Sequence, residues 1–541
     1  MPVKLTINSV DMSARGDRTL FDHAEEHEIR VPTSCFKQGK CRECLVEVVE
    51  GMEHLSSPTE EETHLEERFR LSCRTKITSE TGTVRCHTMR RGSMRVLEGA
   101  SALPTRLEDL ELDSCVARDG DRILLDGQEI HQSSGPIHGI AMDLGTTTVV
   151  LRLVNLESGE LVATTSFENP QRFGGSDVMA RIKYDSDHRG KLLQRTLLGY
   201  LNHAIETLPV DPTTIYEMVV AGNSTMRDIL FGLSVYTIGQ KPYRSLTEHE
   251  YLEGKRTSTS LATDARRLRL PIHPKARVYG MPLISGHVGS DAAACLLAID
   301  LTREERLVTL MDIGTNTELL MGTRDRILAA SCPAGPAFEG GAVSCGVPGL
   351  DGAIERVQIR DSGDVDTTVI GDMRAEGICG SGLVDLMSEL LRTKRMNELG
   401  RFENEEDRFI VDRDANVYFT ENDISELAQA KGANVAGLHI VRTSYGVDYG
   451  DIDVFYLAGG FARHLGVEAA RRIGLIPNLP TEKIVQIGNA AIEGATIALL
   501  SNQRRMELEE VVKSVTHVEL ETDPNFFDYF VNGCQFIPVE S

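Results

Sequence analysis

The phrase IAMDLGTTT at residues 140–148 returns as LMDIGTNT at residues 310–317. Each copy has the pattern of an apolar strand, an Asp-x-Gly-Thr turn and the start of a second strand. The glycine lets the backbone approach a phosphate group, and the turn amides and threonine hydroxyls can donate hydrogen bonds to it. One such turn arises by chance in a long chain. Two copies in the same setting predict a pair of phosphate-binding loops.

The residues of these two turns divide into two chemical roles. Asp143 and Asp312 end apolar strands, and a fixed carboxylate that only accepts hydrogen bonds can hold Mg²⁺ through water. The phosphate contacts are assigned to the turn residues themselves: Gly145, Thr146, Thr147, Gly314, Thr315 and Asn316.

Three more glycine- and alanine-rich phrases occur before and after the second of these loops. They are GSDAAA at 289–294, LAGGFA at 457–462 and GNAAIEGA at 488–495. With the two loops, they resemble the ATPase superfamily of actin, heat-shock chaperones and sugar kinases. In that superfamily two similar subdomains clamp ATP, and the phrases correspond to a first connecting helix, an adenosine loop and a second connecting helix. The alternative is an α/β domain with glycine-rich turns and no nucleotide; a P-loop is excluded because no Gly-x4-Gly-Lys-Ser/Thr occurs.

The resemblance implies further site residues. Asp291 occupies the position of an acid that orients the attacking water, although a helix N-terminal aspartate is the alternative. Gly459 and Gly460 are placed at the adenosine, and Gly380 and Gly382 in GICGSG at 377–382 on the nucleotide side. The phrase GPAFEG at 335–340 is interpreted either as a nucleotide contact or as a plain turn.

A cysteine loop near the N-terminus carries a different chemistry. Cys35, Cys41 and Cys44 lie within ten residues, and Cys73 follows in a Leu-Ser-Cys-Arg context. Four thiolates are what a [2Fe–2S] cluster requires, and Gly39 can supply the positive φ of a loop that wraps it. The five residues between the first two cysteines resemble the spacing of adrenodoxin-type ferredoxins.

Two alternatives compete with this cluster assignment. Zinc is one, because Cys41 and Cys44 form half a zinc knuckle, but zinc would favour a second close pair. Cys86 is the other, as a fourth ligand in place of Cys73. The remaining cysteines are scattered without a disulfide framework and are interpreted as buried small hydrophobes.

The pattern of expected strands and helices divides the chain into three parts. Residues 1–90 predict an α+β, β-grasp ferredoxin-like domain, with strands at 3–7, 45–49 and 83–86 and a helix-compatible acidic stretch at 58–70. Residues 91–136 are interpreted as a linker or reduced middle domain with a strand at 122–125. Residues 137–541 predict a two-subdomain α/β actin-like (ASKHA, ribonuclease H-like) ATPase fold: subdomain I about 137–305, subdomain II about 306–485, and a return helix and tail at 486–541.

Composition limits the partners. The chain has 541 residues and 57 basic against 81 acidic side chains, for a formal charge of −24. Such a field disfavours nucleic acid and anionic membranes. Without a long apolar run or a signal-peptide pattern, we expect a cytoplasmic protein.

A ferredoxin domain joined to an actin-like ATPase resembles the reductive activators of corrinoid-dependent methyltransferases and corrinoid iron–sulfur proteins. Phrases such as AGNSTM at 221–226 and ISGHVG at 284–289 carry that resemblance across most of the chain. It implies a [2Fe–2S] cluster, ATP and Mg²⁺ as cofactors, a corrinoid protein or corrinoid-dependent methyltransferase as partner, a low-potential electron donor and a homodimer. The implied reaction reduces inactive Co(II) corrinoid to Co(I) at the expense of ATP.

Two other functions stay open on the sequence alone. One is an activator of another low-potential metalloenzyme, such as a 2-hydroxyacyl-CoA dehydratase; those activators hold a [4Fe–4S] cluster through cysteines inside the ATPase domain, unlike this chain. The other is a ferredoxin–ATPase redox adaptor whose nucleotide only regulates docking.

Overall fold

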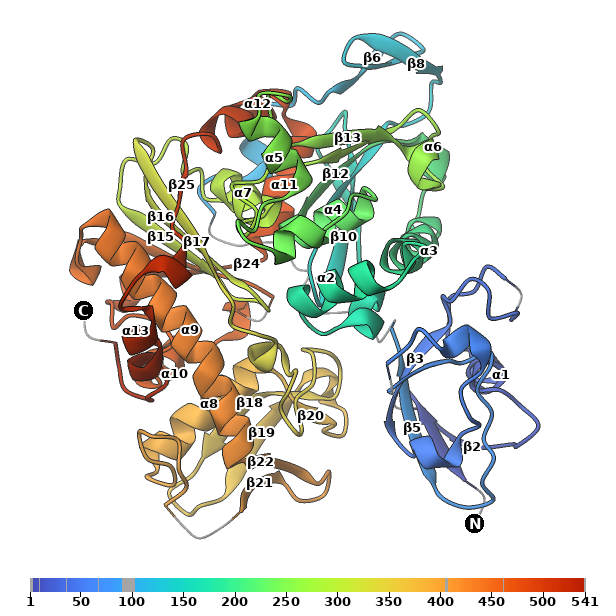
Figure 1. The fold of residues 1–541 in the computed structure, drawn as a ribbon, viewed down its shortest axis with the longest axis vertical. Helices are drawn as coiled ribbons and strands as arrows, with labels where there is room; N and C mark the ends of the chain where they lie inside the picture. Colours follow the sequence, from blue (N-terminus) through green and yellow to red (C-terminus); the bar gives the residue numbers. More distant parts are fainter. Residues whose placement is uncertain are drawn as a thin grey trace.

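The computed structural model describes residues 3–8, 10–35, 37–66, 68–89, 103–403, 407–460 and 462–539 (Figure 1). The N-terminal domain, blue in Figure 1, lies beside helices α2 and α3 of the next domain. No helix in these described parts combines the length and the apolarity needed to cross a bilayer.

The N-terminal domain is a five-stranded mixed sheet in the order β2-β1-β5-β3-β4, with one helix. Strands β1 and β5 run parallel and the other neighbours antiparallel, as expected for the predicted β-grasp fold. A Thr19–Asp22 capping box begins the helix. The elements are β1 Lys4–Ile7, β2 Val10–Ser13, α1 Leu20–Glu26, β3 Leu45–Glu50, β4 Phe69–Leu71 and β5 Thr83–Thr88.

The acidic stretch at 58–70 does not form the helix that its composition allowed. Its described residues contain a single 3-10 turn, Glu60–Glu62, before the chain extends into β4. The reason is Glu62, whose buried carboxylate accepts hydrogen bonds from Arg70 Nε and Leu71 N at 2.9 Å each. A side chain drawn inward to bind the neighbouring strand is incompatible with a solvent-facing helix.

Residues 103–136 of the predicted linker contain an antiparallel three-stranded sheet, β6 Val116–Asp119, β7 Arg122–Leu125 and β8 Gln128–Gln132. The predicted strand at 122–125 is the central one. Asp113 joins this segment to the C-terminal part of the chain, because its carboxylate accepts from Ser501 Oγ at 2.5 Å and from Gln503 N at 2.9 Å.

Subdomain I is built on a six-stranded sheet in the order β11-β10-β9-β12-β14-β13. Its central strands β9 and β12 are buried on both faces and therefore mostly apolar, with Glu217 as a fully buried charge on β12. The strands are β9 His138–Leu144, β10 Thr148–Asn155, β11 Leu161–Glu168, β12 Ile215–Gly222, β13 Leu261–Asp264 and β14 Arg277–Gly280. The helices are α2 Val178–Asp187, α3 Leu192–Glu206, α4 Ser224–Leu230, α5 Leu246–Leu252, α6 Ala265–Leu268 and α7 Ser290–Ala298.

Subdomain II repeats this plan with the sheet order β24-β23-β15-β16-β17-β25. In both sheets an antiparallel hairpin is flanked on its first strand by a parallel strand, so β10-β9-β12 corresponds to β16-β15-β23. The two Asp-x-Gly-Thr turns are therefore equivalent hairpin turns. The strands are β15 Val308–Asp312, β16 Thr317–Thr323, β17 Arg326–Cys332, β23 Val454–Ala458, β24 Ile484–Gly488 and β25 Thr516–His517.

An inserted lobe distinguishes subdomain II from subdomain I. It contains two small sheets, β18 Ala353–Ile359, β19 Val365–Val369 and β20 Gly377–Ile378, then β21 Arg408–Asp412 and β22 Val417–Thr420. Helices α8 Gly380–Arg392, α9 Glu421–Tyr445 and α10 Val467–Arg472 cover them (Figure 1). The long α9 begins with a Thr420–Asp423 capping box and ends at Gly446, whose φ is +88°.

The two subdomains meet where α7 crosses α11 Ala490–Leu500. A Cβ on Gly494 would lie 1.9 Å from the carbonyl oxygen of Ala294, so only glycine permits this close crossing. The chain then continues through α12 Asn502–Val511 to α13 Phe526–Gly533, which packs against α9. The aromatic tail thus folds back onto the domain, as its composition predicts.

Candidate functional site

A cavity of about 280 Å³ lies between the two sheets, and both hairpin turns open into it. Twelve of the thirteen residues predicted for the nucleotide line it: Asp143, Gly145, Thr146, Thr147, Asp291, Asp312, Gly314, Thr315, Asn316, Gly380, Gly459 and Gly460. The residues come from both subdomains. The structure therefore brings the repeated phrases together around one volume.

The two turns have the tight geometry that their glycines allow. Gly145 N donates to Thr148 O at 3.0 Å, and a Cβ on Gly145 would lie 2.6 Å from that oxygen. The turns also touch across the cavity, because Thr147 Oγ1 and Thr315 Oγ1 are 3.2 Å apart. Two hydroxyls this close together can donate to one phosphate group from the same side.

Three aspartates form the acidic wall of the cavity. Burial raises the pKa of Asp143 to about 6, although Asn489 Nδ2 donates to its Oδ2 at 2.7 Å. Burial, with the neighbouring Asp143, raises the pKa of Asp312 to about 7 and that of Asp291 to about 7. Carboxylates that raise one another's pKa are stabilised in the charged form by a divalent cation.

Asp291 lies both in the first turn of a helix and at the cavity. It lies in the first turn of α7, and its Oδ1 accepts from Ala292 N at 2.8 Å. It also lines the cavity with Asp143 and Asp312. Its position at a helix N-terminus therefore does not remove it from the site.

Gly382 is the predicted residue that does not line the cavity. It lies inside α8, where a Cβ would approach the carbonyl oxygen of Ile354 on β18 to 2.3 Å. Its glycine is required for close helix–sheet packing, whereas Gly380 at the start of the same helix faces the cavity.

Three glutamates that line the cavity escaped the sequence-based assignment: Glu318, Glu339 and Glu355. Glu339 Oε2 accepts from Thr147 Oγ1 at 3.1 Å and from Thr315 Oγ1, so it bridges the two turns, and burial raises its pKa. Glu318, on β16, accepts from Ser331 Oγ at 3.0 Å, and burial raises its pKa well above the ordinary value. Glu339 belongs to the phrase at 335–340, which could have identified it; Glu318 follows Asn316 by two residues along a strand.

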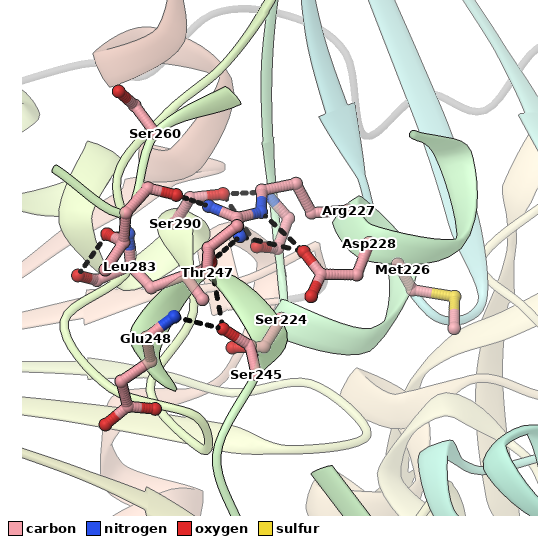
Figure 2. Close-up of polar contacts among 12 residues, drawn as sticks. Ser224, Met226, Arg227, Asp228, Ser245, Thr247, Glu248, Ser260, Leu283 and Ser290 are labelled. Carbon is pink, nitrogen blue, oxygen red and sulfur yellow. Dashed lines mark hydrogen bonds and ion pairs between the residues drawn. The ribbon is translucent and has the colours of Figure 1, made fainter. Parts of the chain in front are cut away.

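Helix α4 supports the first turn from behind. Its N-cap, Asn223, donates from Nδ2 to Thr146 Oγ1 at 3.0 Å. Figure 2 shows the anchor of this helix: Arg227 lies among Asp228, Thr247 and the loop residues around it. The fully buried guanidinium donates to Asp228 Oδ1 at 2.8 Å and 3.0 Å and to Thr247 Oγ1 at 2.9 Å. This buried ion pair holds α4, and with it Asn223, in one position, although the second carboxylate oxygen of Asp228 has no hydrogen-bond partner among the described residues.

Gly459 serves the opposite end of the cavity. Its φ is +116°, and a Cβ would lie 2.3 Å from the carbonyl oxygen of Ile313. The turn after β23 is therefore pressed against the second phosphate turn. Cys379, Ser381 and Phe338 complete the lining from subdomain II.

The cysteine loop, between α1 and β3 of the N-terminal domain, forms a second candidate site. Cys44 Sγ donates to Cys73 Sγ at 3.2 Å, and both residues are buried. Cys35 and Cys41 are half-buried and interact with each other. The thiols thus form two pairs, and no three His, Cys, Asp or Glu side chains of the described residues converge on a single metal position. Two pairs suit two irons better than one zinc.

Backbone amides are directed at these sulfurs. Burial raises the pKa of Cys35, but N–H groups of Cys41, Gln38 and Lys40 outweigh it and lower that pKa to about 7. Gly39, with φ +73°, donates toward Cys73. This is the environment that stabilises thiolates and cluster sulfides. Cys86, in contrast, is fully buried on β5 among the apolar residues of the sheet core.

Comparisons with known proteins identify similar domains along the chain. Family models match the chain in three consecutive ranges: a 2Fe-2S iron-sulfur cluster binding domain at 5–78, the RACo middle region at 138–304, and the C-terminal ASKHA domain of RACo at 306–541. The middle-region match coincides with subdomain I and lies after residues 91–136.

Two curated relatives and one solved structure are similar over most of the chain. The corrinoid activation enzyme RamQ of Eubacterium limosum is 32% identical over 448 residues, covering 77% of this chain and 73% of that protein. The [Co(II) methylated amine-specific corrinoid protein] reductase of Methanosarcina barkeri is 24% identical over 430 residues, covering 73% and 76%. A solved reductive activator for corrinoid, iron-sulfur protein superposes with a TM-score of 0.73 at 26% identity, covering 99% and 98%. The predicted fold of both domains is confirmed.

Proposed function

The chain belongs to the RACo family, and we propose that it is an ATP-dependent reductive activator that returns the Co(II) corrinoid of a partner protein to Co(I). One electron is transferred for each cobalt reduced. The observation that carries the proposal is the coexistence, in one chain, of a paired-cysteine loop and a two-turn cavity lined by three buried aspartates.

The [2Fe–2S] cluster would be held by Cys35, Cys41, Cys44 and Cys73. When bound, it supplies a one-electron carrier whose potential in ferredoxins of the plant type is near −400 mV. The chain's part is to favour the thiolates of Cys35 and Cys73 through the backbone amides of residues 38–41, and to shield Cys44 and Cys73 from water.

The nucleotide would lie in the central cavity with its phosphates between the two turns. Thr147 and Thr315 would donate to the phosphates, and Asp143 and Asp312 would hold Mg²⁺. Asp291 orients the water that attacks the terminal phosphate, and Gly459 and Gly460 let the backbone approach the adenosine.

ATP is needed because reduction to Co(I) is uphill. For a one-electron step each 59 mV of deficit costs about 1.4 kcal/mol. A nucleotide can change that balance only if it binds two conformations with different affinity. The two subdomains, joined at the α7–α11 crossing, provide an element that can close and open around it.

The direct test is anaerobic and optical. The protein is reconstituted with its cluster, reduced, and mixed with a Co(II) corrinoid protein, with and without Mg-ATP. Appearance of the Co(I) spectrum only with Mg-ATP is expected. Reduction that proceeds equally without nucleotide, or a partner that stays Co(II) although the cluster is reduced, would reject the proposal.

Three finer points belong to the same proposal. An external low-potential donor recharges the cluster. The protein acts as a homodimer, for which the exposed Phe527 and Val531 on α13 offer an apolar surface, and analytical ultracentrifugation tests it. It works in the cytoplasm, in line with eleven cysteines that form no disulfide.

A further inference from the structure

The ferredoxin domain is docked on the ATPase domain through its cysteine loop. Glu43, between Cys41 and Cys44, accepts from His203 Nε2 of α3 at 3.3 Å. The helix lacks a side chain where the loop comes closest, since a Cβ on Gly199 would lie 2.7 Å from Glu43 Cγ. Cys44 and Leu45 also share one apolar cluster with residues of α3. The side of the domain that carries the cluster ligands therefore faces α3.

A second contact lies on strand β3, next to the cysteine loop. The Arg172 guanidinium binds Glu47 of β3 at 3.3 Å and 3.4 Å, and also binds Glu168 at the end of β11. Only 6% of the Glu47 side chain and 2% of the Glu168 side chain are exposed. One arginine thus joins a carboxylate of each domain in a largely buried triad, where ionic contacts are sensitive to small displacements.

The turn that carries Arg172 is bonded directly to the first phosphate turn. Asn169, which caps the 3-10 turn Pro170–Gly174, donates from Nδ2 to Gly145 O at 2.8 Å and from its backbone N–H to Thr147 O at 2.7 Å. Asn169 is completely buried. Any rearrangement of Gly145 and Thr147 around a phosphate is therefore transmitted to Arg172 through two hydrogen bonds.

The negative charge of a bound nucleotide would also weaken the contact between Arg172 and Glu47. Glu339, bonded to Thr147 at the cavity, already acts electrostatically on Arg172. A triphosphate bound between the turns adds several negative charges at this place. The guanidinium is then attracted toward the nucleotide and away from Glu47.

We propose that Arg172 is a positioning residue that docks the ferredoxin domain on α3 while the phosphate turns are empty, and that ATP binding loosens this dock. The inference rests on the proposed function, because release exposes the cysteine loop to the corrinoid partner. The structure shows the docked form. The reaction then alternates between a state that protects the cluster and a state that delivers its electron.

Coupling of this kind is reciprocal. If ATP weakens docking by some factor, a variant that cannot dock binds ATP more tightly by the same factor, typically five-fold or more. A contact that merely stabilises the fold would not change ATP affinity in that direction.

The experiment follows amide hydrogen exchange in α3 and in residues 43–50 of the full-length protein with its cluster, with and without a non-hydrolysable ATP analogue. In the natural sequence, nucleotide is expected to speed exchange in both segments by about fivefold. Glu47→Gln should exchange fast in either state and bind the analogue about fivefold more tightly. Glu50→Gln, on the same strand with a half-exposed side chain, is the matched control and should behave as the natural sequence.

His203→Gln is the second variant, because it loosens the dock from the ATPase side without altering β3. Its nucleotide affinity should rise in the same way, with an unchanged cluster spectrum. Nucleotide-independent exchange in the natural sequence, or unchanged affinity in both variants, would overturn the inference. Formation of Co(I) is read separately: if it persists while exchange is insensitive to nucleotide, docking control fails and the proposed function stands. If exchange responds and no Co(I) forms, the function fails and docking control stands.

Discussion

At the scale of single residues, Cys73 and Cys86 provide the sharpest contrast. Cys73 Sγ lies 3.2 Å from Cys44 Sγ, whereas Cys86 is surrounded by the apolar core of the ferredoxin sheet. We expect Cys73→Ala to abolish the visible and EPR signals of the reconstituted cluster. Cys86→Ala should keep both and cost about 1 kcal/mol of stability through a small cavity. A cluster retained in Cys73→Ala would remove Cys73 from the ligand set.

A change at Asp312 is expected to have opposite effects on the stability of the nucleotide-free protein and on its rate of ATP hydrolysis. Its carboxylate is buried beside Asp143 and Asp291, so its charge opposes folding when no cation is present. Asp312→Asn should raise the melting temperature of the nucleotide-free protein and lower ATP hydrolysis by at least about 100-fold. Asp325→Asn, at an 87% exposed carboxylate, serves as control in both assays and should change neither. Unaltered hydrolysis in Asp312→Asn would exclude a role at the phosphates.

Residues of the site could be predicted from the sequence where they belong to a repeated phrase. Asp143 and Asp312 could be assigned because each stands at the same place in a repeated phrase. Asn223 and Glu339 are unique in their settings, and only the fold shows that they contact Thr146 and Thr147. Gly382, which does not line the cavity, was grouped with Gly380 because neighbouring glycines in one phrase look alike, and packing against Ile354 distinguishes the two.

At the scale of elements, the α7–α11 crossing depends on one missing side chain. Gly494→Val would place a branched side chain against the Ala294 carbonyl, where even a Cβ would be 1.9 Å away. We expect a loss of at least about 3 kcal/mol in the unfolding free energy of the ATPase domain, measured in urea. The matched change, Gly446→Val after α9, has open space around its Cβ and is strained only by its φ of +88°. Similar losses in the two variants would show that backbone strain, and not the crossing, dominates.

The tail element α13 should attach to α9 in a pH-dependent way. Lys431 on α9 is 1% exposed, donates to Gly533 O and to Gln535 O at 2.8 Å, and burial lowers its pKa to about 7. Between pH 7 and about 10 the unfolded chain then holds a proton that the folded protein has lost, so stability rises with pH in that window. Below pH 7 the buried charge is fully present and the attachment is weakest.

Hydrogen exchange in residues 526–533 at pH 6.5 and 9, corrected for intrinsic rates, measures this effect. Protection should increase at pH 9 in the natural sequence and show no such change in Lys431→Met. Lys513→Met, at an exposed surface position, is the control. A pH response that survives in Lys431→Met would assign it to another group.

Elements were predictable where periodicity was strong. The strands at 83–86 and 122–125 are within or equal to β5 and β7, and the paired hairpins follow from the repeat. The structure of the acidic stretch at 58–70 was not predictable, because Glu62 is turned inward by a hydrogen bond from Arg70 on β4 that no helix or strand pattern contains. Of the three-stranded sheet at 116–132 only the central strand was predicted, because the outer strands are short and mostly polar.

At the scale of the whole molecule, Mg-ATP should stabilise the ATPase domain by mass action. A ligand at a hundred times its Kd adds about 2.7 kcal/mol. We expect the calorimetric transition of the ATPase domain to move upward with Mg-ATP, while that of the ferredoxin domain stays or moves slightly downward as the dock loosens. ATP without Mg²⁺ should give a smaller upward shift, because the aspartates then face the triphosphate without a cation between them. Equal shifts with and without Mg²⁺ would contradict the proposed metal site.

The matching strand order of the two sheets contrasts with the unlike residues that line the cavity between them. The half formed by subdomain I contributes to the cavity only its phosphate turn, Asn223, Asp291 and Val150, while the inserted lobe of subdomain II adds Cys379, Gly380 and Ser381. A nucleotide has unlike ends, yet the two sheets around the cavity have the same strand order. The lining residues of the inserted lobe have no counterpart in subdomain I, so they make the two sides of the cavity unlike.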